Sequence, residues 1–313
     1  MSEQEAVQET NDEATACKRC AVELGYWKDG FVQQYMRSAE RRAPEINRGY
    51  YVRVQGCYSI VKKFLAQTGG ECQIVSLGSG FDTLYWRLHE ENDLPKCLYE
   101  FDFKQVVARK SLSIKNKRKL NEALIDGSIS GNGVKSSRYH LMACDIRDTD
   151  SMHENLLKAG VDLNLPTLFL AECVLVYLAP EESRGILRWA SKSFLSAFFL
   201  NYEPVNLADR FGDVMRTNLK SRGCPLLGAL TCKTVDDQKS RFLECGWAHC
   251  ECLTMTDVHR YLPADDVKRM ERLEFLDETE TLHQLMDHYC FSWATNDPTN
   301  IGLADIGFLG PRR

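Results

Sequence analysis

Short apolar runs alternate with amphipathic segments through the middle of the chain. Each run has the length of a buried strand, and each is followed by a segment with apolar residues at helical spacing. This alternation is typical of an α/β fold, because parallel strands need a crossover connection between them. We predict a doubly wound, mostly parallel sheet with strands at residues 73–77, 97–101, 139–143, 167–171 and 197–201.

The crossover helices have recognisable starts. The clearest begins at Pro180, which is followed by Glu181 and Glu182. Proline at the first helical position and acids in the first turn are both favourable there. We predict the other crossover helices from about Phe81, at 104–113 and at 150–159.

The chain before the first strand has two different patterns. Residues 1–16 are acidic with almost no apolar side chains, so we predict a disordered tail. Residues 41–49 are predicted to be a charged loop. From about Tyr51 apolar residues recur at helical spacing, and Gly69-Gly70 ends this predicted helix.

The regular alternation stops after Tyr202. We predict helices at 203–222 and 235–245, a strand at 247–253, one or two helices within 263–289, and late edge strands at 291–294 and 306–308. Residues 115–138 are predicted to be a flexible surface insertion. We therefore expect a single domain over 17–313, with a core at about 71–202. The remaining segments, about 203–294 and the N-terminal helices of 17–70, would form a substrate lobe.

Composition excludes some functional classes. The 313 residues are 44% hydrophobic and 27% charged, which is ordinary for a globular protein. A net charge of −5 gives no electrostatic footprint for nucleic acid. No apolar run approaches the roughly 20 residues that span a bilayer. We expect a monomer that binds neither nucleic acid nor membrane.

The 13 cysteines are scattered and odd in number, and the chain opens with polar, acidic residues rather than a secretory signal. Reduced thiols in the cytoplasm, or also in the nucleus, are the expected state. Cys17 and Cys20 form a lone C-x-x-C pair without a second pair at zinc spacing, so we predict no metal site.

A glycine turn follows the first predicted strand. It reads Gly78-Ser79-Gly80-Phe81-Asp82-Thr83 and leads directly into a predicted helix. A dinucleotide fingerprint would place a third glycine at Thr83, where the helix approaches a pyrophosphate. Its absence favours a ligand without phosphates, such as S-adenosylmethionine.

Acidic residues end the next three strands. Asp102 could accept hydrogen bonds from both ribose hydroxyls, and Asp145 from an adenine amino group, with Ile146 packing on the ring. Glu172 would lie beside a positively charged amino or sulfonium group. Each acid alone could simply solvate a strand end. Together they suit a ligand with hydroxyls and positive charge better than one with two phosphates.

Several segments resemble the leucine carboxyl methyltransferase family. They are 77–88 around the glycine turn, Ala43-Pro44-Glu45-Ile46-Asn47-Arg48-Gly49-Tyr50, 171–177, 201–203, Asp209-Arg210-Phe211-Gly212 and Leu273-Glu274-Phe275-Leu276-Asp277-Glu278. The similarity extends over about residues 17–294. Ser79 departs from the usual alanine, and residues 111–138 do not match closely.

This resemblance implies a Rossmann-like class I methyltransferase that uses S-adenosylmethionine. It implies as acceptor the C-terminal leucine carboxylate of the catalytic subunit of protein phosphatase 2A. A relative that acts in tRNA wybutosine synthesis carries an added propeller domain, for which this chain is too short. The cofactor residues implied by the resemblance are Lys18, Arg53, Gly78, Asp102, Asp145, Ile146 and Glu172. Without it, Arg53 would be taken for a solvated charge.

A terminal carboxylate needs no general base, because its pKa of about 3.3–3.7 leaves it ionised at neutral pH. Catalysis would come from alignment of the reacting atoms and from removal of water. Tyr177 is our candidate for orienting the acceptor carboxylate. The alternative is a core tyrosine that caps an apolar run.

Three alternatives stay open. The same fold could methylate another acceptor, either a small-molecule carboxylate or the tRNA wybutosine precursor. A nicotinamide-dependent oxidoreductase is disfavoured by Thr83. A non-catalytic protein that retains the fold is disfavoured by the intact set of strand-end acids.

Overall fold

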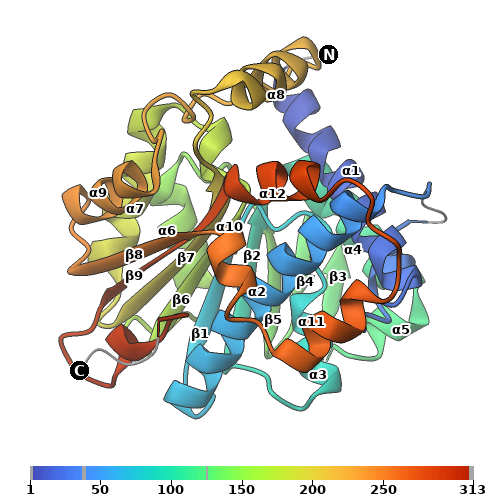
Figure 1. Cartoon of the computed structure of the whole chain (residues 1–313). Coiled ribbons are helices and arrows are strands. Elements are labelled where there is room, and N and C mark those ends of the chain that lie inside the picture. The colour runs from blue at the N-terminus through green and yellow to red at the C-terminus, as the bar shows by residue number, and fades with distance from the viewer. Residues whose placement is uncertain (1–2, 37–39, 125, 310–313) are drawn as a thin grey trace.

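The computed structural model describes residues 3–36, 40–124 and 126–309. Within these residues the strands form one nine-stranded sheet with helices on both faces (Figure 1). The strand order is β3-β4-β5-β2-β1-β6-β7-β9-β8, and β5, β2, β1, β6 and β7 run parallel. The predicted α/β fold with a mostly parallel sheet is confirmed.

The parallel strands lie where the apolar runs predicted them. Their bounds are β1 Gln73–Leu77, β2 Cys97–Asp102, β5 Tyr139–Ala143, β6 Thr167–Glu172 and β7 Ala197–Pro204. Alternate residues of each strand point to opposite faces, and both faces are covered. In β1, Ile74 packs in one core cluster and Val75 in the other.

Helices α2 and α4 contribute to the first cluster, and α6, α7 and α9 to the second. The crossover helices are α3 Leu84–Glu90, α4 Lys104–Asn116, α6 Thr149–Lys158 and α7 Pro180–Ser193. In chain order, β2 and β5 are added on one side of β1. The chain then returns, and β6 and β7 are added on the other side of β1. This reversal leaves a crevice between the carboxyl ends of β1 and β6, where such sheets bind ligands.

The predicted disordered tail is wrong for the residues that the structure describes. Helix α1 covers Glu3–Glu23. It packs through small side chains, since Ala6, Ala16, Cys17 and Ala21 are all buried. Small residues let α1 approach α2 (Pro44–Thr68) closely, and they leave no stripe of large apolar side chains that a sequence pattern would reveal.

Two further segments are more regular than predicted. The loop predicted at 41–49 is already helical from Pro44, which is the first residue of α2. The segment 115–138 contains α5 Arg118–Asn121 and a hairpin of β3 Ser128–Ser130 and β4 Gly133–Lys135. The hairpin extends the sheet, because β4 pairs antiparallel with β5.

The chain after Tyr202 contributes strands as well as helices. Strand β7 continues to Pro204, so the helix predicted from 203 begins only at Arg210. The remaining elements are α8 Arg210–Ser221, α9 Val235–Glu244, β8 His249–Thr254, α10 Met255–His259, α11 Ala264–Glu271, α12 Thr279–Asp287 and β9 Tyr289–Asn296.

The late strands differ from their predicted positions. β9 is an interior strand, because β7 and β8 pair with it on its two sides. Residues 306–308 form no strand and follow the 3-10 helix Leu303–Asp305. Ile306 and Phe308 are buried there in the first core cluster, which explains their apolar character.

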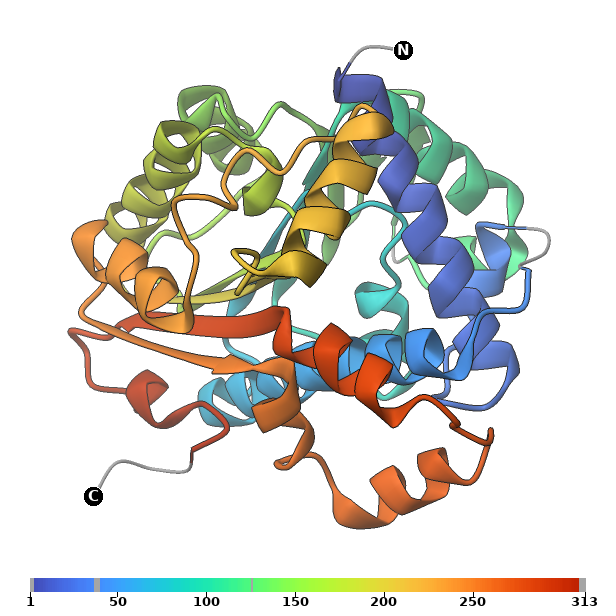
Figure 2. The same ribbon diagram turned by 45° about the horizontal axis from the view of Figure 1, so that its top comes forward.

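Two helices from distant parts of the chain face each other above the sheet. Figure 2 shows α8 beside the first half of α1, over the carboxyl ends of the parallel strands. An ion pair of 3.1 Å between Arg222 Nη1 and Glu13 Oε2 joins the two regions.

Candidate active site

A cavity of about 610 Å³ opens at the carboxyl ends of the parallel strands. The loop after β1 and the ends of β2 and β6 form its floor. Helices α1, α2 and α8 form its walls. Its volume is within the range of small-molecule sites.

The glycine turn is a wall of this cavity. Gly78 has φ +61°, and a Cβ there would lie 2.7 Å from a methyl carbon of Val174. Only glycine suits that combination of conformation and close contact. The neighbouring Ser79 Oγ is buried without a hydrogen-bond partner in the described chain, and the residue lines the cavity. A ligand in the cavity is therefore a candidate partner for this hydroxyl.

Asp102 lies beside this turn. Its Oδ2 accepts from Gly80 N at 2.7 Å, and its Oδ1 accepts from Phe103 N at 2.7 Å. Burial raises the pKa of Asp102, and these two N–H donors act against the rise. Each carboxylate oxygen has a second lone pair, so the group can still accept from ligand hydroxyls.

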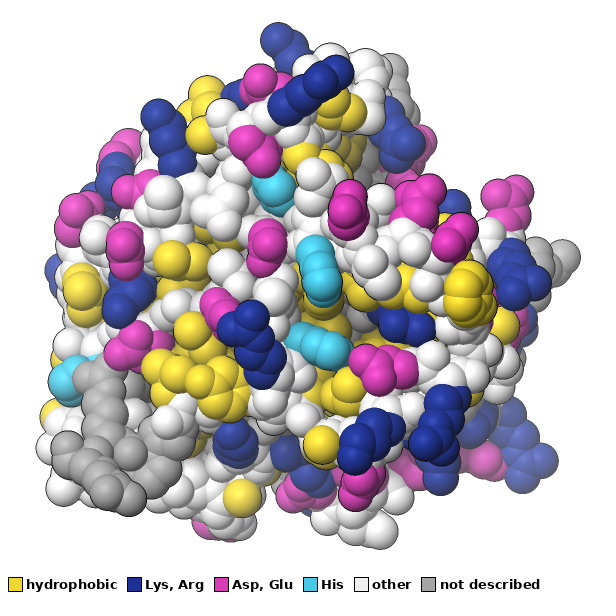
Figure 3. All heavy atoms as spheres, in the orientation of Figure 1, with side chains coloured by type: hydrophobic (Ala, Val, Ile, Leu, Met, Phe, Trp, Pro, Cys, Tyr) yellow, Lys and Arg dark blue, Asp and Glu magenta, His cyan; other side chains and the backbone are white. Residues whose placement is uncertain are grey.

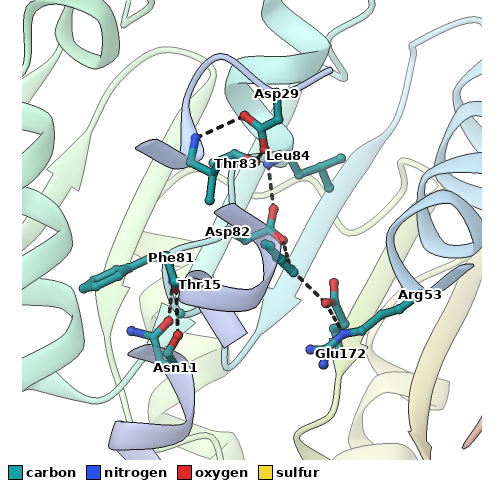
Figure 4. A network of polar contacts seen from close by, with 12 residues as sticks. Asn11, Thr15, Asp29, Arg53, Phe81, Asp82, Thr83, Leu84 and Glu172 are labelled. Carbon is teal, nitrogen blue, oxygen red and sulfur yellow. Dashed lines mark hydrogen bonds and ion pairs between the residues drawn. The ribbon is translucent and has the colours of Figure 1, made fainter. Parts of the chain in front are cut away.

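Four charged side chains meet at the bottom of the cavity. Glu172 Oε1 accepts from Lys18 Nζ at 2.8 Å and from Arg53 Nε at 2.6 Å. Lys18 Nζ also lies 3.3 Å from Asp82 Oδ2. Figure 4 shows Arg53, Glu172 and Asp82 converging from three different elements. The two cations and two carboxylates balance.

The charges keep one another ionised despite their burial. Burial raises the pKa of Glu172, but the charges of Lys18 and Arg53 outweigh it and hold that pKa at about 2. Burial lowers the pKa of Lys18, but Glu172 and Asp82 more than compensate and raise it. A zwitterionic ligand could exchange partners with this cluster, because its carboxylate suits the cations and its ammonium suits the acids.

Ile146 lines the cavity, and so do its sequence neighbours Cys144 and Arg147. Asp145 is not among the lining residues in the described chain. Its carboxylate instead receives Arg147 Nε at 2.9 Å, and this hydrogen bond lowers the pKa of Asp145. A ligand that approached Asp145 would share the carboxylate with Arg147.

Tyr177 lies in the 3-10 helix Leu175–Tyr177, just past β6, and lines the cavity. Burial raises the pKa of its hydroxyl well above the usual range, so the group is a neutral donor. Tyr177 also packs on an apolar cluster that contains Val176 and Leu207. The geometry thus agrees with both interpretations of this residue.

The apolar face of α8 lines the cavity and is only partly covered by protein, because Phe211 packs on His288 whereas Val214 is 54% exposed. Phe211, Val214, Met215 and Leu219 point along this wall, whereas Gly212 is the one buried residue of the helix. The helix is fixed at its start, where Asp209 Oδ1 accepts from Gly212 N at 2.8 Å. His288 Nε2 lies 3.0 Å from the same oxygen.

Comparison with known proteins identifies the family. A model of the leucine carboxyl methyltransferase family matches residues 7–191. The chain belongs to this family. It is 45% identical to leucine carboxyl methyltransferase 1 of Bos taurus, over 98% of this chain and 95% of the relative.

Other similarities are broader. The chain is 36% identical to human tRNA wybutosine-synthesizing protein 4, over 94% of this chain and 44% of that protein. A crystal structure from Thermobifida fusca YX, assigned to the methyltransferases, has a TM-score of 0.52 at 10% identity and covers 84% of this chain and 91% of that one. The likeness to the Thermobifida fusca structure shows the fold alone.

Family membership makes the chain a methyltransferase, in agreement with the sequence prediction and with S-adenosylmethionine as the expected cofactor. All predicted site residues except Asp145 line the cavity: Lys18, Arg53, Gly78, Asp102, Ile146, Glu172 and Tyr177. Their individual roles remain predictions. In the described ranges, no cluster of three side chains could hold a metal ion, and no helix is long and apolar enough to cross a membrane.

Sequence reasoning missed two polar residues of this methyltransferase site. Asn11 of α1 accepts from Phe81 N at 2.8 Å, and Asp29 accepts from Thr83 Oγ1 at 2.6 Å. Asn11 lay in the tail predicted to be disordered. Asp29 lies between α1 and α2, and no local signal in either segment pointed to the glycine turn.

Proposed function

We propose that this protein transfers a methyl group from S-adenosylmethionine to the C-terminal leucine carboxylate of the protein phosphatase 2A catalytic subunit. The observation that carries the proposal is the balanced cluster of Lys18, Arg53, Asp82 and Glu172 beside the glycine turn. In a member of the leucine carboxyl methyltransferase family, this cluster fits the amino-acid part of the cofactor.

The residues that line the cavity suit most of this cofactor. Lys18 and Arg53 would bind the methionine carboxylate, and Glu172 the ammonium group. Asp102 would accept from the ribose hydroxyls. The unpaired Ser79 Oγ, which the sequence did not predict, gives the turn one further polar contact.

At the adenine end, Ile146 would pack on the ring, and Asp145 would accept from the amino group while Arg147 holds it. When bound, the cofactor supplies an electrophilic methyl group on a sulfonium.

The chain's own residues need only position and desolvate the acceptor. The acceptor carboxylate is ionised at neutral pH, so no residue has to remove a proton. Methyl transfer from the bound cofactor would replace its carbon–sulfur bond with a carbon–oxygen bond to the acceptor and would leave the electron pair on sulfur. The neutral hydroxyl of Tyr177 would orient the carboxylate without neutralising its charge. Charge disappears in this step, and a water-poor site favours such a step.

The acceptor would lie along α8. Its face of Phe211, Val214 and Met215 is apolar and open to the cavity, which suits an aliphatic side chain next to the carboxylate. Burial of a leucine side chain contributes roughly 1.5–3 kcal/mol. This wall belongs to the segment after Tyr202 that the sequence assigned to the acceptor.

A direct experiment uses S-adenosylmethionine with a labelled methyl group and the purified phosphatase catalytic subunit. Label should enter the subunit and leave as methanol in mild base, as expected for an ester. A subunit without its terminal leucine should accept no label. Equal labelling of both forms would overturn the proposal.

The human relative that acts in wybutosine synthesis motivates one alternative acceptor. Labelling of tRNA instead of the phosphatase subunit in the same assay would favour it. On the face drawn in Figure 3, basic and acidic side chains are interspersed, so this face offers no basic track for tRNA.

A further inference from the structure

Helix α1 contacts the glycine turn through Asn11. Its Oδ1 accepts from Phe81 N at 2.8 Å, as the dashed line in Figure 4 shows. A Cβ on Gly80 would lie only 2.4 Å from that same oxygen, and Gly80 has φ +51°. The second glycine of the turn is therefore needed for the approach of α1, in addition to any approach of a ligand.

This contact is connected to Asp102. Gly80 N donates to Asp102 Oδ2 at 2.7 Å, and the next amide, of Phe81, donates to Asn11. Two successive amides of the turn are thus held by side chains from two different elements, β2 and α1. The two amides belong to adjacent planar peptide units that meet at Gly80, so the φ and ψ angles of Gly80 set the direction of one amide relative to the other.

The same helix supplies Lys18 to the charged cluster. Asn11 and Lys18 are seven residues apart, which is about two helical turns, so both face the turn. The outer contacts of α1 are exposed ion pairs, Asp12 with Arg109 at 2.9 Å and Glu13 with Arg222 at 3.1 Å. Such pairs contribute little, so Asn11 and Lys18 hold α1 on the turn.

We propose that Asn11 is a positioning residue of the cofactor site. It fixes the Phe81 amide, and thereby the orientation of the Gly80 amide and of the Asp102 carboxylate, and it seats α1 so that Lys18 reaches Glu172. The inference rests on the proposed function to the extent that its ligand is S-adenosylmethionine.

Three variants test this role. Asn11→Ala removes the acceptor oxygen, Asn11→Asp keeps an acceptor at the same position, and Glu9→Ala changes an exposed side chain of the same helix that does not line the cavity. Calorimetric titration with S-adenosylmethionine should show affinity about tenfold weaker for Asn11→Ala, since a buried N–H loses its partner. Asn11→Asp should bind within about threefold of wild type, and Glu9→Ala within about twofold.

Two further measurements separate positioning from a general structural role. In steady-state assays, Asn11→Ala should raise the KM for S-adenosylmethionine and leave kcat and the KM for the acceptor nearly unchanged. In the ligand-free protein, hydrogen exchange at the Phe81 amide should be faster in Asn11→Ala and slow again in Asn11→Asp. If Asn11→Ala does not fold, Asn11→Gln takes its place, because its oxygen is displaced by one methylene.

Unchanged affinity in Asn11→Ala, or equal weakening in Asn11→Asp and Glu9→Ala, would overturn this inference. A wild-type protein that binds no S-adenosylmethionine would instead overturn the proposed function. The exchange rate at Phe81 can be read in either case, so the two failures are distinguishable.

Discussion

Thr83 occupies the position where a dinucleotide-binding turn would have glycine, and the structure gives a reason for it. Its Oγ1 donates to Asp29 Oδ2 at 2.6 Å. Asp29 Oδ1 in turn accepts from Phe31 N at 2.8 Å and Val32 N at 3.1 Å. Thr83, which replaces the glycine of the fingerprint, thus joins the glycine turn to the segment between α1 and α2.

We expect Thr83→Val to lower the free energy of unfolding by roughly 1–3 kcal/mol, because a buried carboxylate oxygen loses its donor while the side-chain volume is kept. Urea unfolding monitored by circular dichroism measures this change. Thr83→Ser retains the hydroxyl and is the matched control. Equal losses in the two variants would show that the hydrogen bond is not the cause.

The charge cluster predicts a pH dependence of stability. The pKa of Glu172 is about 2 in the folded protein, well below the value of about 4.3 in an unfolded chain. Because the folded pKa is the lower one, the stabilisation is present above about pH 4.3 and is lost as the pH falls toward 2. The linked free energy is on the order of 3 kcal/mol.

The measurement is the free energy of unfolding as a function of pH for the wild type and Glu172→Gln. The wild-type curve should be steeper between about pH 4.3 and 2, since only it takes up this proton. Parallel curves through that window would contradict the assignment.

The sequence was informative about site residues that sit in local patterns. Gly78, Asp102 and Glu172 each follow a strand that the apolar runs define, so their convergence at one edge was predictable. Lys18 and Arg53 required the family resemblance. Asn11 and Asp29 were not predictable, because each acts across a contact between segments more than 50 residues apart.

At the scale of elements, the parallel strands were predicted well because each is a continuous apolar run with turn residues at its ends. Helix α1 was missed because its buried face consists of alanines and cysteines. The place of β9 between β7 and β8 was missed because pairing order is not encoded in any local pattern.

The exposed face of α8 gives a prediction about the acceptor. Val214 lines the cavity and is 54% exposed. We expect Val214→Asp to raise the KM for a leucine-terminated peptide acceptor about tenfold or more, because a charge would replace the apolar contact. The affinity for S-adenosylmethionine should stay the same.

Leu243→Asp on α9 is a matched control, because Leu243 is 47% exposed and lies outside the residues that line the cavity. Peptide kinetics and cofactor titration compare the two variants. Equal effects of both substitutions on the peptide KM would count against α8 as the acceptor wall.

At the scale of the whole molecule, the proposed cofactor would join α1, α2 and the ends of β1, β2 and β6. At a concentration of 100 Kd it should add about 2.7 kcal/mol to the free energy of unfolding. Thermal and urea unfolding measure this gain.

A comparison ligand tests which part of the cofactor links α1 to the rest of the cavity. 5′-Methylthioadenosine lacks the amino-acid part and cannot reach Lys18 or Arg53. We expect hydrogen exchange in α1 to slow with S-adenosylmethionine and to remain fast with methylthioadenosine at equal occupancy. Equal protection by both ligands would mean that the charge cluster does not couple α1 to the cofactor.

The position of α1 also has a practical consequence for work with this protein. Its early residues Val7, Gln8 and Thr10 line the cavity beside α8. The 3-10 helix near the other end of the chain lies on the far side of the molecule (Figure 2). An affinity tag or fluorescent fusion placed ahead of α1 would therefore lie near the rim of this cavity, where the proposed acceptor would enter. The same tag at the C-terminus would leave that rim clear.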